Sequence, residues 1–170
     1  MNRNFILCLL FAFSTVLNSC HKNCCNVEAS TGNWVKLSDF SSVTNVRSET
    51  VTFVIDDLAY LTGGVDKNFI RYNDLWQFGP VKILWTQKAS LPSSARSSAV
   101  GMNINDKGYV GTGYDGTNLL KDFWQYDPSS NSWAQKASFT GIARYDAVAF
   151  GIQNYGYIAT GFDTASLKDC

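Results

Sequence analysis

Apolar side chains recur at every second position in three short segments of the chain. The segments contain Val51, Phe53 and Ile55, then Val100, Met102 and Ile104, and then Val148, Phe150 and Ile152. A period of two is typical of a β-strand with one buried face. A turn cluster follows each segment, at residues 56–57, 105–108 and 153–156, and leads into a second apolar segment. Each pair of segments therefore predicts an antiparallel β-hairpin.

Two further strands are predicted after the first hairpin, and two more after the second. The third strand reads Asp-apolar-Trp-Gln-aromatic, at residues 74–78 and 122–126. Turn residues follow, and a fourth strand begins with a tryptophan, at residues 85–88 and 133–136. Four consecutive antiparallel strands in each copy are typical of one blade of a β-propeller.

Other residues recur together with the strands. Copies begin at Trp34, Trp85 and Trp133, which are 51 and 48 residues apart. Each copy then contains an arginine, a tyrosine and a Thr-Gly pair, and these are Arg47, Arg96 and Arg144, Tyr60, Tyr109 and Tyr157, and Thr62-Gly63, Thr112-Gly113 and Thr160-Gly161. A repeat of about 50 residues with this content indicates a propeller, and the recurring tyrosines and tryptophans are expected in its core.

The copies resemble kelch repeats, the blades of galactose-oxidase-type propellers. The resemblance covers residues 34–170 and depends on the double glycine Gly63-Gly64, the aromatic residue that ends the third strand, and the tryptophan after it. It implies an all-β fold, a β-propeller of four-stranded antiparallel kelch blades, with about two complete blades plus a partial third. Residues 168–170 align with residues 121–123, within a third strand, so we expect an N-terminal fragment of a longer propeller.

The first 19 residues are predicted to be an export signal, because Arg3 precedes an apolar stretch at residues 5–17. The sequence Leu17-Asn18-Ser19-Cys20 resembles a bacterial lipobox, which implies lipidation of Cys20 and a tether at residues 20–33. A lipid anchor would hold the protein in the bacterial cell envelope, as an outer-membrane or cell-surface lipoprotein with a periplasmic or extracellular face. The alternative is an ordinary secretory signal that leaves Cys20 as a plain thiol.

Charge disfavours nucleic acid as a partner. The chain has 14 basic and 14 acidic residues and no block of like charge. Aromatic residues make up 14% of the sequence and charged residues only 16%, which favours an ordered domain. The five cysteines do not define a disulfide framework.

Two sets of residues are candidates for ligand binding. Arg47, Arg96 and Arg144 precede the innermost strand of each copy, so they are predicted to line one rim of the central channel, where guanidinium groups could hold carboxylates. The architectural alternative pairs each arginine with backbone carbonyls or acids of the adjacent blade. Loops that differ between copies are the second set, with Asp66, Asp115 and Asp163 as candidate contacts.

The sequence predicts neither a metal site nor a cofactor. Galactose oxidase holds copper with tyrosines and histidines, and the one histidine here, His21, lies in the expected tether. We therefore expect a binding module for protein or carbohydrate ligands. The alternative is a fragment of a carbohydrate-active propeller enzyme, sialic-acid epimerase-like or galactose-oxidase-like, with catalytic residues in further blades. A third possibility is a non-functional gene remnant.

Overall fold

The computed structural model describes residues 45–164 and Ser166, which all belong to the compact unit Ser38–Cys170. The predictions for the signal peptide, Cys20, the tether, the strand at Trp34 and the last four residues lie outside the described residues. Strands, turns and irregular segments make up the described part, and none of it forms a helix long and apolar enough to cross a membrane.

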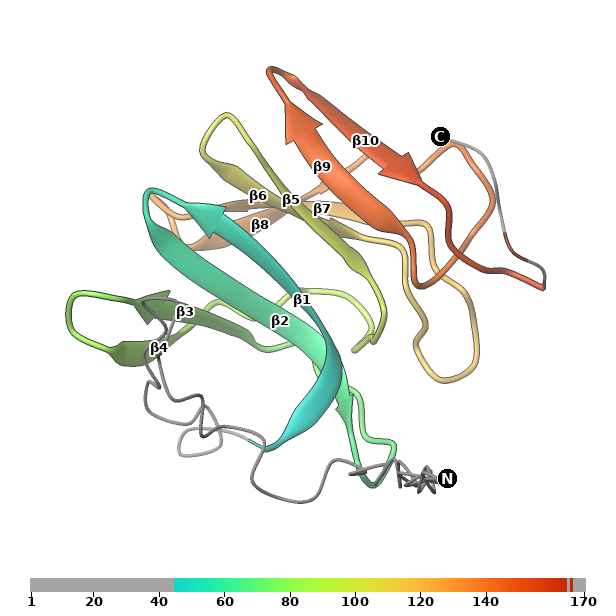
Figure 1. Ribbon diagram of the computed structural model, residues 1–170, viewed down its shortest axis with the longest axis horizontal. Helices are drawn as coiled ribbons and strands as arrows, with labels where there is room; N and C mark the ends of the chain where they lie inside the picture. Colours follow the sequence, from blue (N-terminus) through green and yellow to red (C-terminus); the bar gives the residue numbers. More distant parts are fainter. Residues whose placement is uncertain (1–44, 165, 167–170) are drawn as a thin grey trace, which may run out of the picture. The chain divides into compact units, whose positions relative to one another are not determined.

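The strands form two four-stranded antiparallel sheets and one hairpin (Figure 1). Blade 1 consists of β1 (Arg47–Ile55), β2 (Leu58–Asp66), β3 (Leu75–Gly79) and β4 (Leu84–Lys88). Blade 2 consists of β5 (Val100–Ile104), β6 (Lys107–Gly111), β7 (Phe123–Asp127) and β8 (Ser132–Lys136). The hairpin pairs β9 (Val148–Ile152) with β10 (Tyr155–Ala159). Sheet order follows chain order, which confirms the all-β fold of four-stranded antiparallel blades.

The first hairpin turn is at residues 56–57 as predicted, but the turns of the second and third hairpins are two residues long, at 105–106 and 153–154, and not four residues long as predicted. Ile104 pairs with Lys107, so only Asn105 and Asp106 lie between β5 and β6. Both have positive φ, 51° and 58°, as required for the two-residue turns that suit the twist of a β-hairpin. Gly108 belongs to strand β6 and not to the predicted turn. Its lack of a Cβ atom leaves room for the Phe53 ring of the neighbouring blade.

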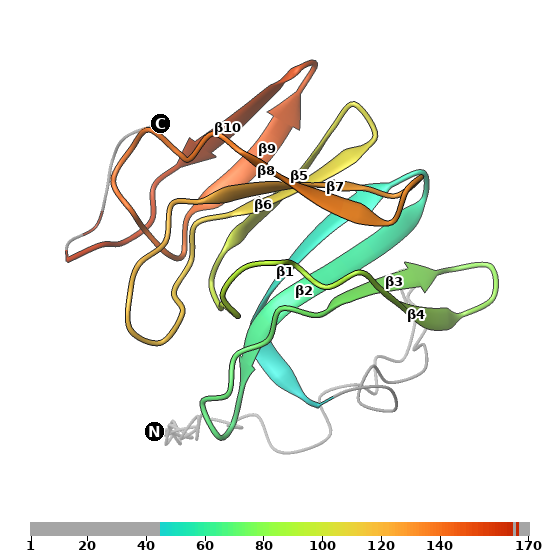
Figure 2. The ribbon, with the colours of Figure 1, turned by 180° about the vertical axis from the view of Figure 1, so that it is seen from behind.

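Packing between blades joins an apolar face of one sheet to a glycine-bearing face of the next. Val51 and Phe53 of β1 are buried against β5 and β6, at Gly101 and Gly108. A Cβ atom at Gly108 would overlap the Phe53 ring. The same arrangement joins Met102 of β5 to Gly156 of β10. Figures 1 and 2 show β1, β5 and β9 side by side, so the first strands of the three copies neighbour one another.

Ring contacts complete the core between blades 1 and 2. Tyr60 of β2 stacks on Phe53 with 5.2 Å between ring centroids and meets Tyr126 of β7 at 5.6 Å. Gln77 donates a hydrogen bond to the Tyr60 hydroxyl at 2.6 Å, which satisfies the polar end of the buried ring. These contacts agree with the core role predicted for Tyr60.

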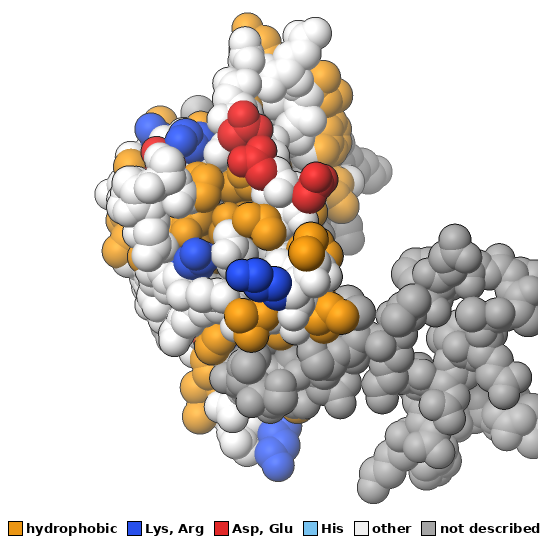
Figure 3. Space-filling model, turned by 90° about the vertical axis from the view of Figure 1, so that its left-hand side faces the viewer, with side chains coloured by type: hydrophobic (Ala, Val, Ile, Leu, Met, Phe, Trp, Pro, Cys, Tyr) orange, Lys and Arg blue, Asp and Glu red, His pale blue; other side chains and the backbone are white. Residues whose placement is uncertain are grey.

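The outward face of the β9–β10 hairpin is apolar and exposed. It carries Val148, Phe150, Ile152, Tyr155 and Tyr157. Phe150 is 45% exposed, whereas Phe53, at the same position of blade 1, is 5% exposed. In blades 1 and 2 the equivalent face of the first hairpin is buried against the next sheet, whereas in β9–β10 it is exposed. The space-filling view from the side of the β3–β4 turn shows scattered basic and acidic side chains around hydrophobic ones, without a continuous basic surface on that side (Figure 3).

Candidate functional site

The structure places the guanidinium groups of Arg47 and Arg96 inside their own blades. Arg96 is 1% exposed and donates to both carboxylate oxygens of Asp122 at 2.8 Å and to the Thr112 carbonyl at 3.0 Å. Arg47 donates to both carboxylate oxygens of Asp74, at 2.6 and 2.9 Å. Bidentate pairs of this kind fix the planar guanidinium in one orientation.

Arg144 repeats the contact with the backbone. It is 0% exposed, donates to the Thr160 carbonyl at 2.7 Å and lies over the Phe139 ring. In all three copies the accepting carbonyl is sixteen residues after the arginine. The structure therefore supports the architectural alternative for the three arginines. The paired acids belong to the same blade, however, and not to the adjacent one.

A recurrent Asp-x-Trp sequence connects this ion pair to the third strand. Trp76 donates its indole N–H to Asp74 at 2.7 Å, and Trp124 donates to Asp122 at 2.7 Å. Burial alone would raise the pKa of Asp122, but hydrogen bonds from Arg96, Trp124 and Ser93 outweigh it and lower the pKa to about 2. The carboxylate that holds Arg96 is thus stabilised in its charged form.

The offset from the arginine also corrects the predicted alignment of the Thr-Gly pairs. Gly63, Thr112 and Thr160 share the position, with φ of 70°, 57° and 62°, so Gly63 and not Thr62 is equivalent to the two threonines. In the first two copies, the glycine that follows donates a backbone hydrogen bond to the arginine of the next copy, from Gly64 to the Arg96 carbonyl at 2.8 Å in the first. The amide of Gly113 donates to the Arg144 carbonyl at 2.8 Å.

Positions two residues after the arginines form one edge of a cleft. Glu49, Ser98 and Asp146 occupy these positions and share positive φ, at 56°, 53° and 52°. The Ser98 amide donates to the Glu49 carbonyl at 3.0 Å, and the Asp146 amide donates to the Ser98 carbonyl at 3.0 Å. These bonds link the starts of three successive copies, and the carboxylates of Glu49 and Asp146 are left exposed.

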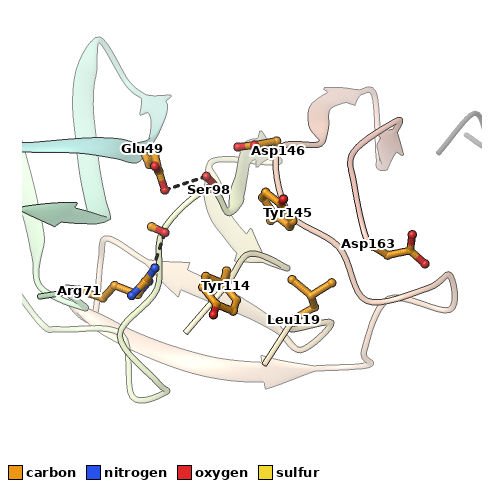
Figure 4. A pocket seen from close by; sticks show the side chains of 9 residues that line it. Glu49, Arg71, Ser98, Tyr114, Leu119, Tyr145, Asp146 and Asp163 are labelled. Carbon is orange, nitrogen blue, oxygen red and sulfur yellow. Dashed lines mark hydrogen bonds between the residues drawn. The ribbon is translucent and has the colours of Figure 1, made fainter. Parts of the chain in front are cut away.

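The cleft has a volume of about 500 Å³ and lies where segments from all three copies meet. We call it the loop cleft, and it is lined by Glu49, Arg71, Ser97, Ser98, Tyr114, Leu119, Tyr145, Asp146 and Asp163. Figure 4 shows the rings of Tyr114 and Tyr145 in its middle, with Glu49, Ser98 and Asp146 along one edge.

A row of flat groups runs through the loop cleft. The guanidinium carbon of Arg71 lies 4.7 Å from the centroid of the Tyr114 ring, and Arg71 also donates to the Ser97 hydroxyl at 3.3 Å. Tyr114 and Tyr145 are 6.3 Å apart between centroids, and Phe162 meets the edge of Tyr145 at 5.5 Å. Half-buried rings beside exposed carboxylates offer both stacking and hydrogen-bonding surface to a ligand.

Two of the predicted ligand contacts, Asp66 and Asp115, instead accept hydrogen bonds from backbone amides of their own loops. Asp66 accepts hydrogen bonds from the amides of Asn68 and Ile70, each at 2.9 Å, and from the Tyr72 hydroxyl. Asp115 accepts from the amides of Thr117 at 2.8 Å and Asn118 at 2.7 Å. The bond from Asn118 is the main cause that lowers the pKa of Asp115.

Asp163 is the one predicted loop contact that lines the loop cleft. The amide of Thr164 donates to its carboxylate. Sequence reasoning missed Glu49, Asp146 and the two tyrosines. A polar residue two positions after each arginine was a usable signal, whereas the approach of Tyr114 to Tyr145 depends on how the copies pack. Within the described residues, no group of three or more His, Cys, Asp or Glu side chains could hold a metal ion.

Four-stranded antiparallel blades that pack face to face, with loops that meet at one end, define the class of β-propeller repeat proteins. Within that class, residues 109–140 match the family model of the Kelch motif. The matched residues include most of β6 and all of β7 and β8. The match shows a Kelch motif in these residues, and the motif is consistent with the four-stranded blade that they help to form. A comparison with curated proteins gives no significant match.

Proposed function

We propose that this protein is an exported, lipid-anchored binding module of a bacterial cell envelope, which binds protein or carbohydrate ligands in the loop cleft. The kelch repeat itself suggests a protein-interaction module of the β-propeller class. One observation carries the proposed site. Side chains from three successive copies converge in a single cleft of about 500 Å³.

The buried arginines support this choice of site indirectly. Arg47, Arg96 and Arg144 stabilise the blades, so the side chains that remain for a ligand are those in the loops. Arg71, Tyr114 and Asp163 lie in loops whose lengths and sequences differ between copies, although the strands around them repeat. Variable loops on a repeated scaffold are typical of binding surfaces.

Arrays of peptides and glycans, probed with the mature chain, test the binding function. Tyr145→Ala removes the central ring of the loop cleft, and Tyr155→Ala removes an exposed ring of β10, outside the cleft. We expect ligands that bind the unaltered chain and the Tyr155→Ala variant but not the Tyr145→Ala variant. No bound ligand, or ligands retained by both variants, would contradict the proposed site.

Metabolic labelling with a palmitate analogue tests the proposed anchor. The analogue should label the chain in a bacterial host, and the Cys20→Ser variant should lose both the label and its membrane association. An unlabelled chain that is still exported would show that Leu17-Asn18-Ser19-Cys20 precedes an ordinary secretory cleavage site.

A further inference from the structure

We propose that the loop cleft binds a cationic side chain, arginine or lysine, of a protein ligand. This inference rests on the proposed binding function and names the chemistry of the group that the cleft accepts. It follows from the charge of the cleft, from its aromatic row, and from a guanidinium group that already occupies one end of that row.

The described side chains that line the loop cleft carry a net negative charge. Three carboxylates, from Glu49, Asp146 and Asp163, line it together with one guanidinium, from Arg71. Glu49 and Asp146 are both exposed and stand on either side of Ser98, whose hydroxyl donates to Glu49 at 3.0 Å (Figure 4). Carboxylates placed in this way offer charge-assisted hydrogen bonds to an incoming cation and repel an anion.

The aromatic row provides a second attraction for the same group. Arg71 lies over the face of Tyr114 at 4.7 Å, a distance at which a cation is attracted by a ring. Tyr145 is the next ring along the row and lines the same cleft. The cleft therefore holds one guanidinium of its own and places another tyrosine beside exposed carboxylates.

A neutral sugar could stack on these rings but would gain little from the net negative charge, and an acidic peptide would meet repulsion from Glu49 and Asp146. A cation uses both features of the cleft. Among side chains, arginine matches them best, because its flat guanidinium stacks on rings and donates two parallel hydrogen bonds to a carboxylate.

A pair of nearly isosteric peptides tests the inference. Acetyl-Gly-Arg-Gly-amide and its citrulline counterpart, which lacks the charge, are titrated into the isotopically labelled mature chain and followed by NMR chemical shifts. We expect the arginine peptide to bind more tightly than the citrulline peptide, and its affinity to fall as salt rises from about 50 to about 500 mM. Equal binding of the two peptides would overturn the inference.

A matched pair of double variants locates the binding. Glu49→Gln with Asp146→Asn removes two charges from the cleft, and affinity should fall about tenfold. Asp57→Asn with Asp106→Asn removes two exposed charges at the hairpin turns, and affinity should stay unchanged. Unaltered spectra and urea unfolding of each variant show that it is folded. An equal loss of affinity in both double variants would overturn the inference.

The array experiment separates the two proposals. If the arginine peptide fails to bind while an array ligand still depends on Tyr145, the cleft is a binding site for another chemical class and only this inference fails. If neither the arginine peptide nor any array ligand depends on the cleft, both proposals fail.

Discussion

Arg96 illustrates at the scale of one residue why the repeated arginines belong to the scaffold. A guanidinium removed from water needs a countercharge and acceptors for its N–H groups, because an unpaired buried charge is very costly. Asp122, the Thr112 carbonyl and the Ser93 hydroxyl supply them. The arginine thereby joins the segment before β5 to the ends of β6 and of the loop before β7.

Removal of the countercharge should destabilise the chain strongly. We expect Asp122→Asn to lower the free energy of unfolding at neutral pH by about 3 kcal/mol, since Arg96 stays buried without its anion. Asp106→Asn, a matched change at an exposed turn, should have an effect below about 0.5 kcal/mol. Urea unfolding followed by tryptophan fluorescence measures both. Similar small effects would show that the Arg96–Asp122 pair is not structural.

Asp122 should also give the chain a specific dependence on pH. Its pKa in the folded state is about 2, below the usual value of 3.8 for an aspartate, so the folded state favours the charged carboxylate. This contribution is present above about pH 4 and is lost as the pH falls through about 2. We expect the stability of the unaltered chain to decrease over this interval more steeply than that of Asp122→Asn. Parallel curves for the two proteins would contradict the assignment.

The recurrence of the arginines was visible in the sequence, but the aspartates that pair with them were not predicted. The Asp-x-Trp repeat at residues 74–76 and 122–124 was visible, yet nothing in a single sequence states that this aspartate meets the arginine before the first strand. That contact depends on the third strand lying two places away from the first in the sheet. The same limit explains why Thr62 was aligned with Thr112, although the backbone makes Gly63 its counterpart.

At the scale of strands and hairpins, glycine decides how closely two blades approach. Gly101 and Gly108 lie on the face of blade 2 that receives Val51 and Phe53. Strand periodicity predicted these hairpins correctly, because alternation records which face of a strand is buried. The period of two did not reveal that the opposite face also packs, against the apolar side chains of the preceding blade.

We expect Gly108→Ala to destabilise the chain by about 1–3 kcal/mol, because the added methyl overlaps the Phe53 ring. Gly79→Ala is a suitable control, since its new Cβ would lie 3.9 Å from Leu58, an ordinary contact. Phe53→Leu should cost less in the Gly108→Ala background than alone, since the smaller side chain leaves room for the methyl. Strictly additive effects in urea unfolding would show that the two residues do not meet.

At the scale of the whole described unit, the β9–β10 hairpin leaves an apolar face exposed. The equivalent faces of blades 1 and 2 are buried. Phe150 and Tyr157 stack at 5.4 Å, as Phe53 and Tyr60 do in blade 1, but remain exposed. An apolar surface of this kind is prone to association. The convergence of loops into one cleft also belongs to this scale, because it depends on the stacking of three copies and not on any local pattern.

Equivalent substitutions on the two hairpins should differ strongly in their effect on stability. Phe150→Lys should reduce binding of the dye ANS and self-association, and leave the unfolding free energy within about 1 kcal/mol, because the ring is already exposed. Phe53→Lys should destabilise the chain by more than about 4 kcal/mol, because it buries a charge in the core. Light scattering, ANS fluorescence and urea unfolding measure these quantities. Equal destabilisation by both would show that β9–β10 is covered in solution.

The most direct test of the central claim, that the loop cleft is the binding site, is an NMR map of amide shifts caused by the tightest ligand from the peptide and glycan arrays. We predict that the largest shifts occur at Glu49, Ser98, Tyr114, Tyr145 and Asp146. Shifts confined to the hairpin turns at residues 56–57 and 105–106, or shifts spread evenly over the chain, would contradict the claim.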